Sequence, residues 1–164
     1  MRLITRADLA DLAYGAALLG TGGGGSPWIG RLAAEALLDQ GGEICMIAPA
    51  ELDPEALVVT VAMVGAPTIM TEKLFRGDEM TQALALLERL HGRPVAAILP
   101  VEVGGLNSTI PLVAAGRLGL PVIDADGMAR AFPEVQMVSF GIAGIPAAPM
   151  VLVNEHGDHA LVQS

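Results

Sequence analysis

Hydrophobic positions along the chain follow two repeating patterns, which predict alternating helices and strands. Helical spacing extends over residues 5–19, from Pro27 up to the Gly41-Gly42 pair, over 78–90 and over 110–118. Thr5 and Asp8 suit an N-terminal cap of the first helix. Ser108 is expected to cap the fourth helix and Gly119 to end it. The third helix is amphipathic, with a predicted buried side at Met80, Leu84, Leu87 and Leu90.

Short apolar runs between these helices predict strands. The runs over residues 57–64, 95–99 and 121–123 alternate with helices, and 43–47 is a further short candidate. Strand, helix and strand in this order are typical of a largely parallel sheet flanked by helices, and the run over 57–64 is expected to be covered on both faces. Residues 137–140 predict another strand, and 150–153 with 160–162 predict a C-terminal β-hairpin. The pattern therefore favours an α/β fold, expected as one domain over residues 1–164.

Charge and composition narrow the choice of partners. The formal net charge is −9, with only nine Lys and Arg, so we expect no nucleic-acid partner and no membrane surface. Only 16% of residues are charged, against roughly 25% in typical globular proteins, and 52% are hydrophobic. Part of this apolar surface is expected to meet a partner domain or a second copy. Cys45 is the single cysteine, and no signal-like leader opens the chain, so a cytoplasmic location is expected.

A glycine-rich loop over residues 20–25 joins the first two predicted helices. Glycine at this density is typical of a backbone that adopts positive φ or comes very close to another group. Because a helix follows, the backbone N–H groups of the loop are candidates for binding a carboxylate, phosphate or oxyanion. The candidate ligand-binding residues are Thr21, Gly22, Gly23, Gly24 and Gly25. A tight connection between two helices is the alternative interpretation.

Polar residues cluster after the predicted strands, where parallel sheets bind their ligands. Glu102 and Asn107 follow the strand over 95–99, and Asp124 and Asp126 follow that over 121–123. A second glycine loop, at Gly104 and Gly105, opens the fourth helix. Two such loops at one end of a sheet predict a site for a small planar anion, with Arg130 and Glu134 also in the ligand-binding set.

The aspartates allow two interpretations. Asp124 and Asp126, with Glu102 and Glu134 in reach, form an oxygen-rich set that fits magnesium, calcium or manganese. Alternatively, at least one of the two aspartates caps Gly127 and a short helix after it. His156 and His159 are expected to be exposed turn residues, and Cys45 a small core residue. The cofactor is therefore unassigned, with a divalent metal as the candidate.

Four segments together resemble a known family. The chain looks like the N-terminal domain of the S-methyl-thiohydantoin desulfurase family, which is associated with hydantoinase and oxoprolinase proteins. The segments that carry this resemblance are residues 20–25, residues 65–67 with Glu72-Lys73, residues 102–107 and residues 124–134. The resemblance implies a cytoplasmic enzyme that hydrolyses a five-membered cyclic imide or thioimide. Family members usually continue into a second, β-rich domain and commonly have glycine at the position of Ala129.

Two functions from different classes follow. In the first, Glu102 or Asp126 deprotonates water directly or through a metal, Asn107 hydrogen-bonds the ring amide, and the glycine loop acts as an anion hole. The reaction is then C–S or C–N hydrolysis of a thiohydantoin- or hydantoin-like ring. In the second, the chain is a non-catalytic domain that binds a small acid or assembles with a partner subunit carrying the catalytic groups.

Overall fold

A five-stranded sheet organises the chain. The computed structural model describes residues 1–66, 68–73 and 77–163, so Pro67 of the predicted loop lies outside the described residues. The strand order is β1-β2-β5-β4-β3. β1 (Arg2–Leu3) pairs antiparallel with β2 (Cys45–Ile47). The other neighbouring strands pair in parallel, in the order β2, β5 (Val122–Ile123), β4 (Ala97–Pro100) and β3 (Val58–Val61). The predicted largely parallel α/β sheet is confirmed, with β1 as an unpredicted edge strand.

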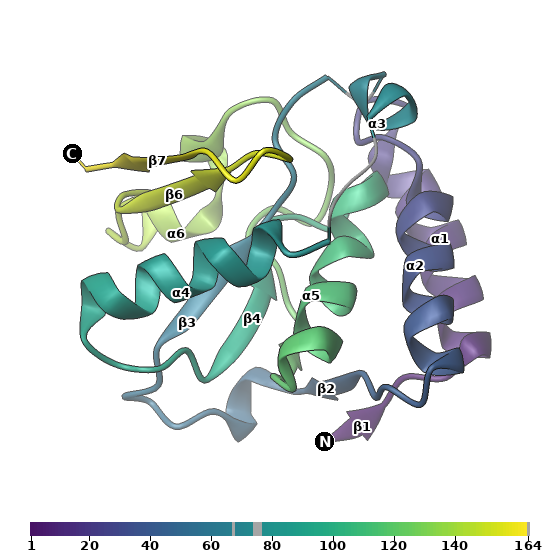
Figure 1. Cartoon of the computed structure of the whole chain (residues 1–164), viewed down its shortest axis with the longest axis horizontal. Coiled ribbons are helices and arrows are strands. Elements are labelled where there is room, and N and C mark those ends of the chain that lie inside the picture. The colour runs from purple at the N-terminus through teal and green to yellow at the C-terminus, as the bar shows by residue number, and fades with distance from the viewer. Residues whose placement is uncertain (67, 74–76, 164) are drawn as a thin grey trace.

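The predicted helices are present with nearly the predicted bounds. α1 (Arg6–Gly20) and α2 (Pro27–Asp39) lie side by side (Figure 1). α4 (Glu79–His91) and α5 (Ile110–Leu118) connect β3 to β4 and β4 to β5. Thr5 and Asp8 form the expected capping box, in which the Thr5 N–H donates to Asp8 Oδ2 at 2.8 Å. Gly119 ends α5 with φ of 67°. Shorter helical segments are η1 (Pro49–Glu51) and α3 (Ile69–Glu72).

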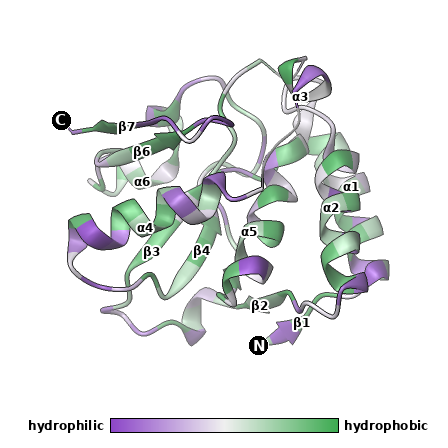
Figure 2. Ribbon diagram, in the orientation of Figure 1, coloured by the Kyte–Doolittle hydropathy of each residue, from purple (hydrophilic) through white to green (hydrophobic). Residues whose placement is uncertain are grey.

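Alternating strand residues divide the core between the two faces of the sheet. Ile98 and Val122 belong to a large cluster that also contains Leu9 of α1 and Leu112 of α5. Their chain neighbours Ala97, Leu99 and Ile123 form a smaller cluster on the other side, against which Phe140 packs. In Figure 2, β4 and most of α5 are coloured hydrophobic, whereas α4 is striped, as expected for a helix with one buried side.

The C-terminal hairpin is confirmed. β6 (Met150–Val153) and β7 (His159–Val162) pair antiparallel, with Val151 opposite Leu161. β6 packs against α4, on the opposite side of the molecule from α1 and α2 (Figure 1). No helix in the described part of the chain is both long and apolar enough to cross a membrane.

Three element predictions are wrong. Residues 137–140 form no strand: η3 (Val135–Met137) is followed by α6 (Ser139–Ile142), because the segment makes local hydrogen bonds such as Gly141 N–H to the Val138 carbonyl instead of pairing with the sheet. No helix follows Gly127. The strand over 57–64 is only four residues long, and its Thr60 is exposed because β3 is an edge strand.

Two side-chain predictions are also wrong. Leu90 is 40% exposed because it lies in the last turn of α4, whereas Leu84 and Leu87 are buried as expected. Ser108 does not cap α5, because the chain first makes a 3-10 turn, η2 (Gly105–Ser108), which makes Thr109 the residue before the helix.

Candidate functional site

The two glycine-rich loops pack directly against each other. The Leu106 N–H donates to the Gly24 carbonyl at 2.8 Å. A Cβ at Gly24 would lie 2.7 Å from the Gly104 carbonyl oxygen, and a Cβ at Gly105 would lie 2.2 Å from the Gly24 oxygen. No side chain fits in these spaces. Glycine at Gly24 and Gly105 therefore permits close contact between the loop after α1 and the loop after β4.

Several N–H groups of the first loop are not free, contrary to the sequence prediction. Thr21 N–H donates to the Leu18 carbonyl at 3.3 Å, and those of Gly23 and Gly24 donate to the Gly20 carbonyl at 2.9 and 3.1 Å. These bonds satisfy the carbonyls at the end of α1. Gly22 and Gly25 have positive φ, and Thr21, Gly22 and Gly23 are exposed. Their role in ligand binding stays a prediction.

Glu102 and Asn107 are brought together as predicted, at the carboxyl end of β4. Glu102 is only 4% exposed; its Oε1 accepts from Asn107 Nδ2 at 2.8 Å and its Oε2 from the Gly104 N–H at 2.5 Å. Asn107 Oδ1 also accepts from the Met63 N–H at 2.7 Å, which ties this loop to the end of β3. Both side chains are thus occupied by contacts within the protein.

The charge of Glu102 is disfavoured where it lies. Burial raises its pKa above the ordinary value, and the negative charge of Asp126 raises it further. Hydrogen bonds from Asn107 and from the Gly104 N–H act in the opposite direction without cancelling the effect of burial. A carboxyl group with a raised pKa is a feature of many catalytic sites and of some purely structural ones.

Asp126 holds two loops with a single carboxylate oxygen. Its Oδ2 accepts from the Val103 N–H at 2.9 Å and from the Ala129 N–H at 2.7 Å. Ala129 has φ of 64°, a left-handed conformation that favours glycine. This conformation explains why the resemblance places glycine at this position. Within the described residues, Asp126 Oδ1 has no hydrogen-bond partner, so it is the oxygen that remains free to meet a ligand.

The other predicted ligands are more scattered. Asp124, Arg130 and Glu134 are all exposed. The Arg130 guanidinium donates to the neighbouring Ala131 carbonyl at 2.9 Å. The Glu134 carboxylate accepts from the Gln136 side chain. No group of three or more His, Cys, Asp or Glu able to hold a metal occurs in the described residues. A metal at Asp124 and Asp126 stays a prediction that this geometry does not strengthen.

The remaining candidate residues lie apart from this site. His156 and His159 are exposed on the hairpin, as expected. Cys45 is a free thiol in β2 and is half-buried, whereas a core position is predicted.

One pocket reaches the polar residues at the strand ends. This pocket, which we call the α1 pocket, has a volume of about 390 Å³ and lies between α1 and the carboxyl ends of β4 and β5. Asp124 and Asp126 line it, but Glu102 and Asn107 do not. It is lined by Leu12, Gly15, Ala16, Leu19, Met46, Pro100, Val103, Ser108, Leu112, Val122, Ile123, Asp124, Ala125 and Asp126.

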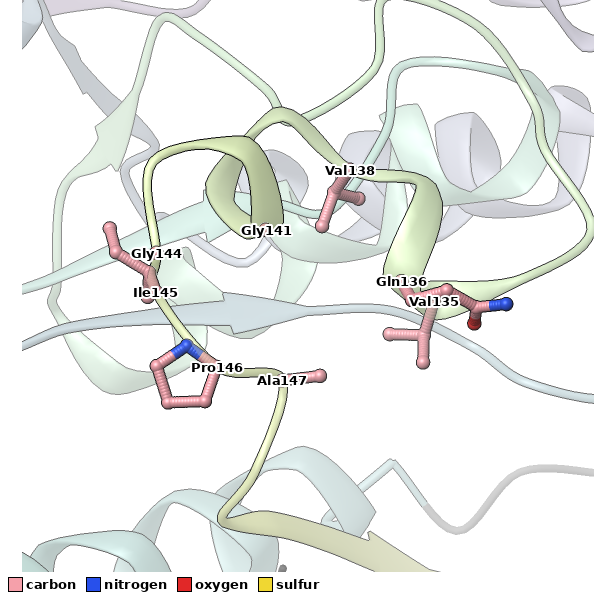
Figure 3. Close-up of a pocket in the computed structure, with 8 residues that line it drawn as sticks. All are labelled: Val135, Gln136, Val138, Gly141, Gly144, Ile145, Pro146 and Ala147. Carbon is pink, nitrogen blue, oxygen red and sulfur yellow. The ribbon is translucent and has the colours of Figure 1, made fainter.

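A second pocket of about 300 Å³ lies beside α6 (Figure 3). All eight residues drawn there come from one stretch, residues 135–147, and none of them is ionisable. Of these two pockets the α1 pocket is the better candidate for chemistry, because it combines carboxylates with apolar lining residues and the pocket beside α6 does not.

Sequence reasoning missed the part of the site contributed by α1 and by Ser108. Gly15 and Ala16 of α1 line the pocket, but small residues occur along the whole of this helix, so the sequence does not mark these two positions. Ser108, expected to be a helix cap, instead lines the pocket. The lining residues of α1 and Ser108 come from segments far apart in the chain, so no local sequence pattern predicts that they line one pocket.

A family model and a solved structure are similar to this chain. The profile of the family described as "S-Me-THD-like, N-terminal domain" matches residues 7–164. A crystal structure of a protein from Chromobacterium violaceum is similar, with a TM-score of 0.82 and 29% sequence identity. The similarity covers 100% of this chain and 45% of that one, so this chain spans less than half the length of the matched protein. No curated protein matches the sequence.

Proposed function

Because the chain belongs to the S-Me-THD-like N-terminal domain family, we propose that it is an enzyme domain that hydrolyses a thiohydantoin- or hydantoin-like ring at the mouth of the α1 pocket. The observation that carries the proposal is the position of Asp126. Asp126 lines the pocket, one of its carboxylate oxygens is fixed by two backbone N–H groups, and the other has no hydrogen-bond partner within the described residues.

Asp126 acts as the general base in this proposal. Water attacks the ring carbon that carries the sulfur, a C–O bond forms and the C–S bond breaks. One water proton passes through Asp126 to the departing thiol, and the other ends on the ring nitrogen. Glu102 and Asn107 position the Gly104–Ser108 segment from behind, since both are hydrogen-bonded to the protein and neither lines the pocket. No step of this reaction uses a metal.

Replacing Asp126 with asparagine tests the proposal. Asparagine keeps one acceptor oxygen for the Val103 and Ala129 N–H groups, but it cannot take a proton. We expect turnover of an S-methyl-thiohydantoin, followed by proton NMR, to fall by roughly 10²–10⁴-fold with the fold intact. Asp124→Asn is the matched control, because Asp124 lines the same pocket and makes no equivalent loop contacts. Unchanged turnover in Asp126→Asn would remove Asp126 from the chemistry.

A second candidate function, a non-catalytic assembly domain, is favoured by an exposed apolar surface. The α1–α2 patch consists of Tyr14, Leu18, Trp28 and Leu32, with Leu18 77% and Leu32 64% exposed. The Tyr14 and Trp28 rings meet edge to face at 5.1 Å between centroids, which joins the two helices into one surface. Such a patch is typical of a surface that binds another protein domain.

The two functions differ in what the folded chain does by itself. As an assembly domain, the chain shows no turnover, and Leu18→Glu abolishes its association with a second copy or partner in light scattering. Leu161→Glu on β7 is the control, because Leu161 is also exposed, at 48%, but lies on the hairpin. Turnover by the isolated chain would exclude the assembly function as its only role.

A further inference from the structure

The α1–α2 patch has the composition of the centre of a protein interface. Tyr14 and Leu18 lie one helical turn apart on α1, and Trp28 and Leu32 lie one turn apart on α2. All four side chains are exposed, although the Tyr14 and Trp28 rings contact each other. Tyrosine and tryptophan are the apolar residues that contribute most to binding when they lie at the centre of an interface.

The size of the patch fits a dimer interface. Its exposed side chains present roughly 450–500 Å² per copy, with exposed fractions between 38% for Trp28 and 77% for Leu18. A standard interface buries about 800 Å² on each partner, of which about 65% is apolar between two identical chains. The patch therefore supplies most of the apolar area that such an interface requires.

The charges beside the patch largely cancel within each copy. Arg6 forms ion pairs with Asp39 and with Glu35, the latter at 3.6 Å. Arg31 Nε donates to Glu35 Oε1 at 2.8 Å. Exposed Asp11 adds one carboxylate with no ion pair among the described residues. Two copies of a chain with a net charge of −9 repel each other, so they meet at the least cost where the local charges are balanced.

The position of the patch favours a second copy over a following domain. The matched crystal structure extends beyond this fold, since the similarity covers 45% of that chain. β7 lies on the opposite side of the molecule from α1 and α2, so a domain that continued from β7 would begin far from the patch (Figure 1). Such a domain would first meet the hairpin, where Leu152 and Leu161 are also exposed.

We infer that two copies of this chain associate through the α1–α2 patch about a two-fold axis, so that two helix pairs pack face to face. Each patch then contacts the same patch of the other copy, and its four apolar side chains form the centre of the interface. The ion pairs of Arg6 with Glu35 and Asp39 stay at the solvent-exposed rim. This inference is independent of the hydrolase; it rests on the assembly function proposed above and names its partner.

Trp28 allows a direct test, because it is the single tryptophan of the chain and belongs to the patch. Sedimentation velocity measures the mass of the intact chain over a range of about 0.1–500 µM. We expect a dimer to form within this range and acrylamide quenching of Trp28 fluorescence to fall by about twofold or more as it forms, because the ring becomes buried. A monomer at every concentration, or dimer formation without a change in Trp28 quenching, would overturn the inference.

Substitutions on both helices locate the interface. Leu18→Glu and Leu32→Glu should each raise the dissociation constant of the dimer by at least about 100-fold, because a two-fold dimer places the new charge in its interface twice. Both leucines are largely exposed, so circular dichroism should show an intact fold in each variant. Leu161→Glu is the matched control, because it makes the same change at an exposed leucine of β7. Dissociation by Leu161→Glu, or a dimer that survives both patch variants, would refute the assignment.

Failure of this inference is distinguishable from failure of the proposed functions. A dimer without turnover would keep this inference and refute the hydrolase. A monomer with turnover that depends on Asp126 would keep the hydrolase and refute this inference. A monomer that binds another protein domain through Leu18 would keep the assembly function and refute a second copy as its partner.

Discussion

Replacing Gly105 with alanine measures how strongly the contact between the two glycine loops stabilises the fold. Gly105 has φ of 62° and Gly119 has φ of 67°, so alanine meets the same left-handed conformation at both positions. That conformation costs alanine about 1–2 kcal/mol. The two sites differ in their surroundings: nothing lies within 4 Å of a Cβ at Gly119, whereas a Cβ at Gly105 would lie 2.2 Å from the Gly24 oxygen and 2.4 Å from the Gly24 carbonyl carbon.

The steric part of the effect follows from these distances. Relief of the contact requires one loop to move by about 1 Å, since ordinary carbon–oxygen contacts are near 3.4 Å. This movement breaks the 2.8 Å hydrogen bond from Leu106 N–H to the Gly24 carbonyl. An unpaired buried backbone group costs about 1–3 kcal/mol. We therefore expect Gly105→Ala to lower the free energy of unfolding by about 2–5 kcal/mol and Gly119→Ala by about 1–2 kcal/mol.

Urea denaturation followed by circular dichroism measures both variants, with equal m values as the check that the unfolding reaction is the same. Equal losses at the two positions would refute the close-packing argument, because they would leave only the cost of the φ angle. If Gly105→Ala does not fold, Gly24→Ala keeps the test open. Gly24 does not have positive φ, yet a Cβ there would lie 2.7 Å from the Gly104 oxygen.

Three further predictions concern the site and the core. Because burial raises the pKa of Glu102, the folded state binds the carboxyl proton of Glu102 more tightly than the unfolded state does. This proton binding stabilises the folded state below about pH 4.5, and the stabilisation is lost as the pH rises through the raised pKa. The free energy of unfolding of wild type minus that of Glu102→Gln, which does not titrate, should therefore fall as urea titrations move from pH 4 to pH 7, roughly the range that brackets carboxyl ionisation, and a rise in this quantity would contradict the sign. Ala129→Gly should raise the free energy of unfolding by up to about 1 kcal/mol, since glycine adopts φ of 64° without strain but is more flexible when unfolded; a loss in thermal denaturation would show that the angle is not maintained. Leu9→Ala should lower the free energy of unfolding by about 2–5 kcal/mol in urea denaturation, because Leu9 is 0% exposed. Leu18 lies on the same helix and is 77% exposed, so Leu18→Ala should change the free energy of unfolding of the monomer by less than about 0.5 kcal/mol.

Local sequence patterns were sufficient for most elements of the fold. α1, α2, α4 and α5 and the hairpin of β6 and β7 were predictable because their hydrophobic spacing and turn residues are local signals. Residues 137–140 were not, because a short apolar run does not by itself distinguish a strand from a helical turn. β1 is only two residues long and pairs with β2, so its existence depends on a partner more than 40 residues away.

The sequence also identified which polar residues gather at the strand ends, but not which of them face a ligand. Glu102, Asn107 and Asp126 do lie close together, as the order of strands required. Their contacts nevertheless differ: Glu102 and Asn107 are hydrogen-bonded to the backbone N–H groups of Gly104 and Met63, whereas Asp126 is the one of the three that lines the pocket. The direction of a side chain after a strand depends on what packs around it, which a single sequence does not record.

The sequence by itself therefore determined the α/β fold, the family and the end of the sheet where the polar residues collect. Helical and strand periodicity and the order of elements are properties of the chain alone, so these conclusions needed no coordinates. Only the tertiary structure decided that the glycines serve loop-to-loop packing and that Ser108 lines a pocket. It also decided that this pocket carries negative charge. Each of these depends on atoms from segments such as residues 15–24 and 104–126 meeting within a few ångströms, because close packing and hydrogen bonding act through space.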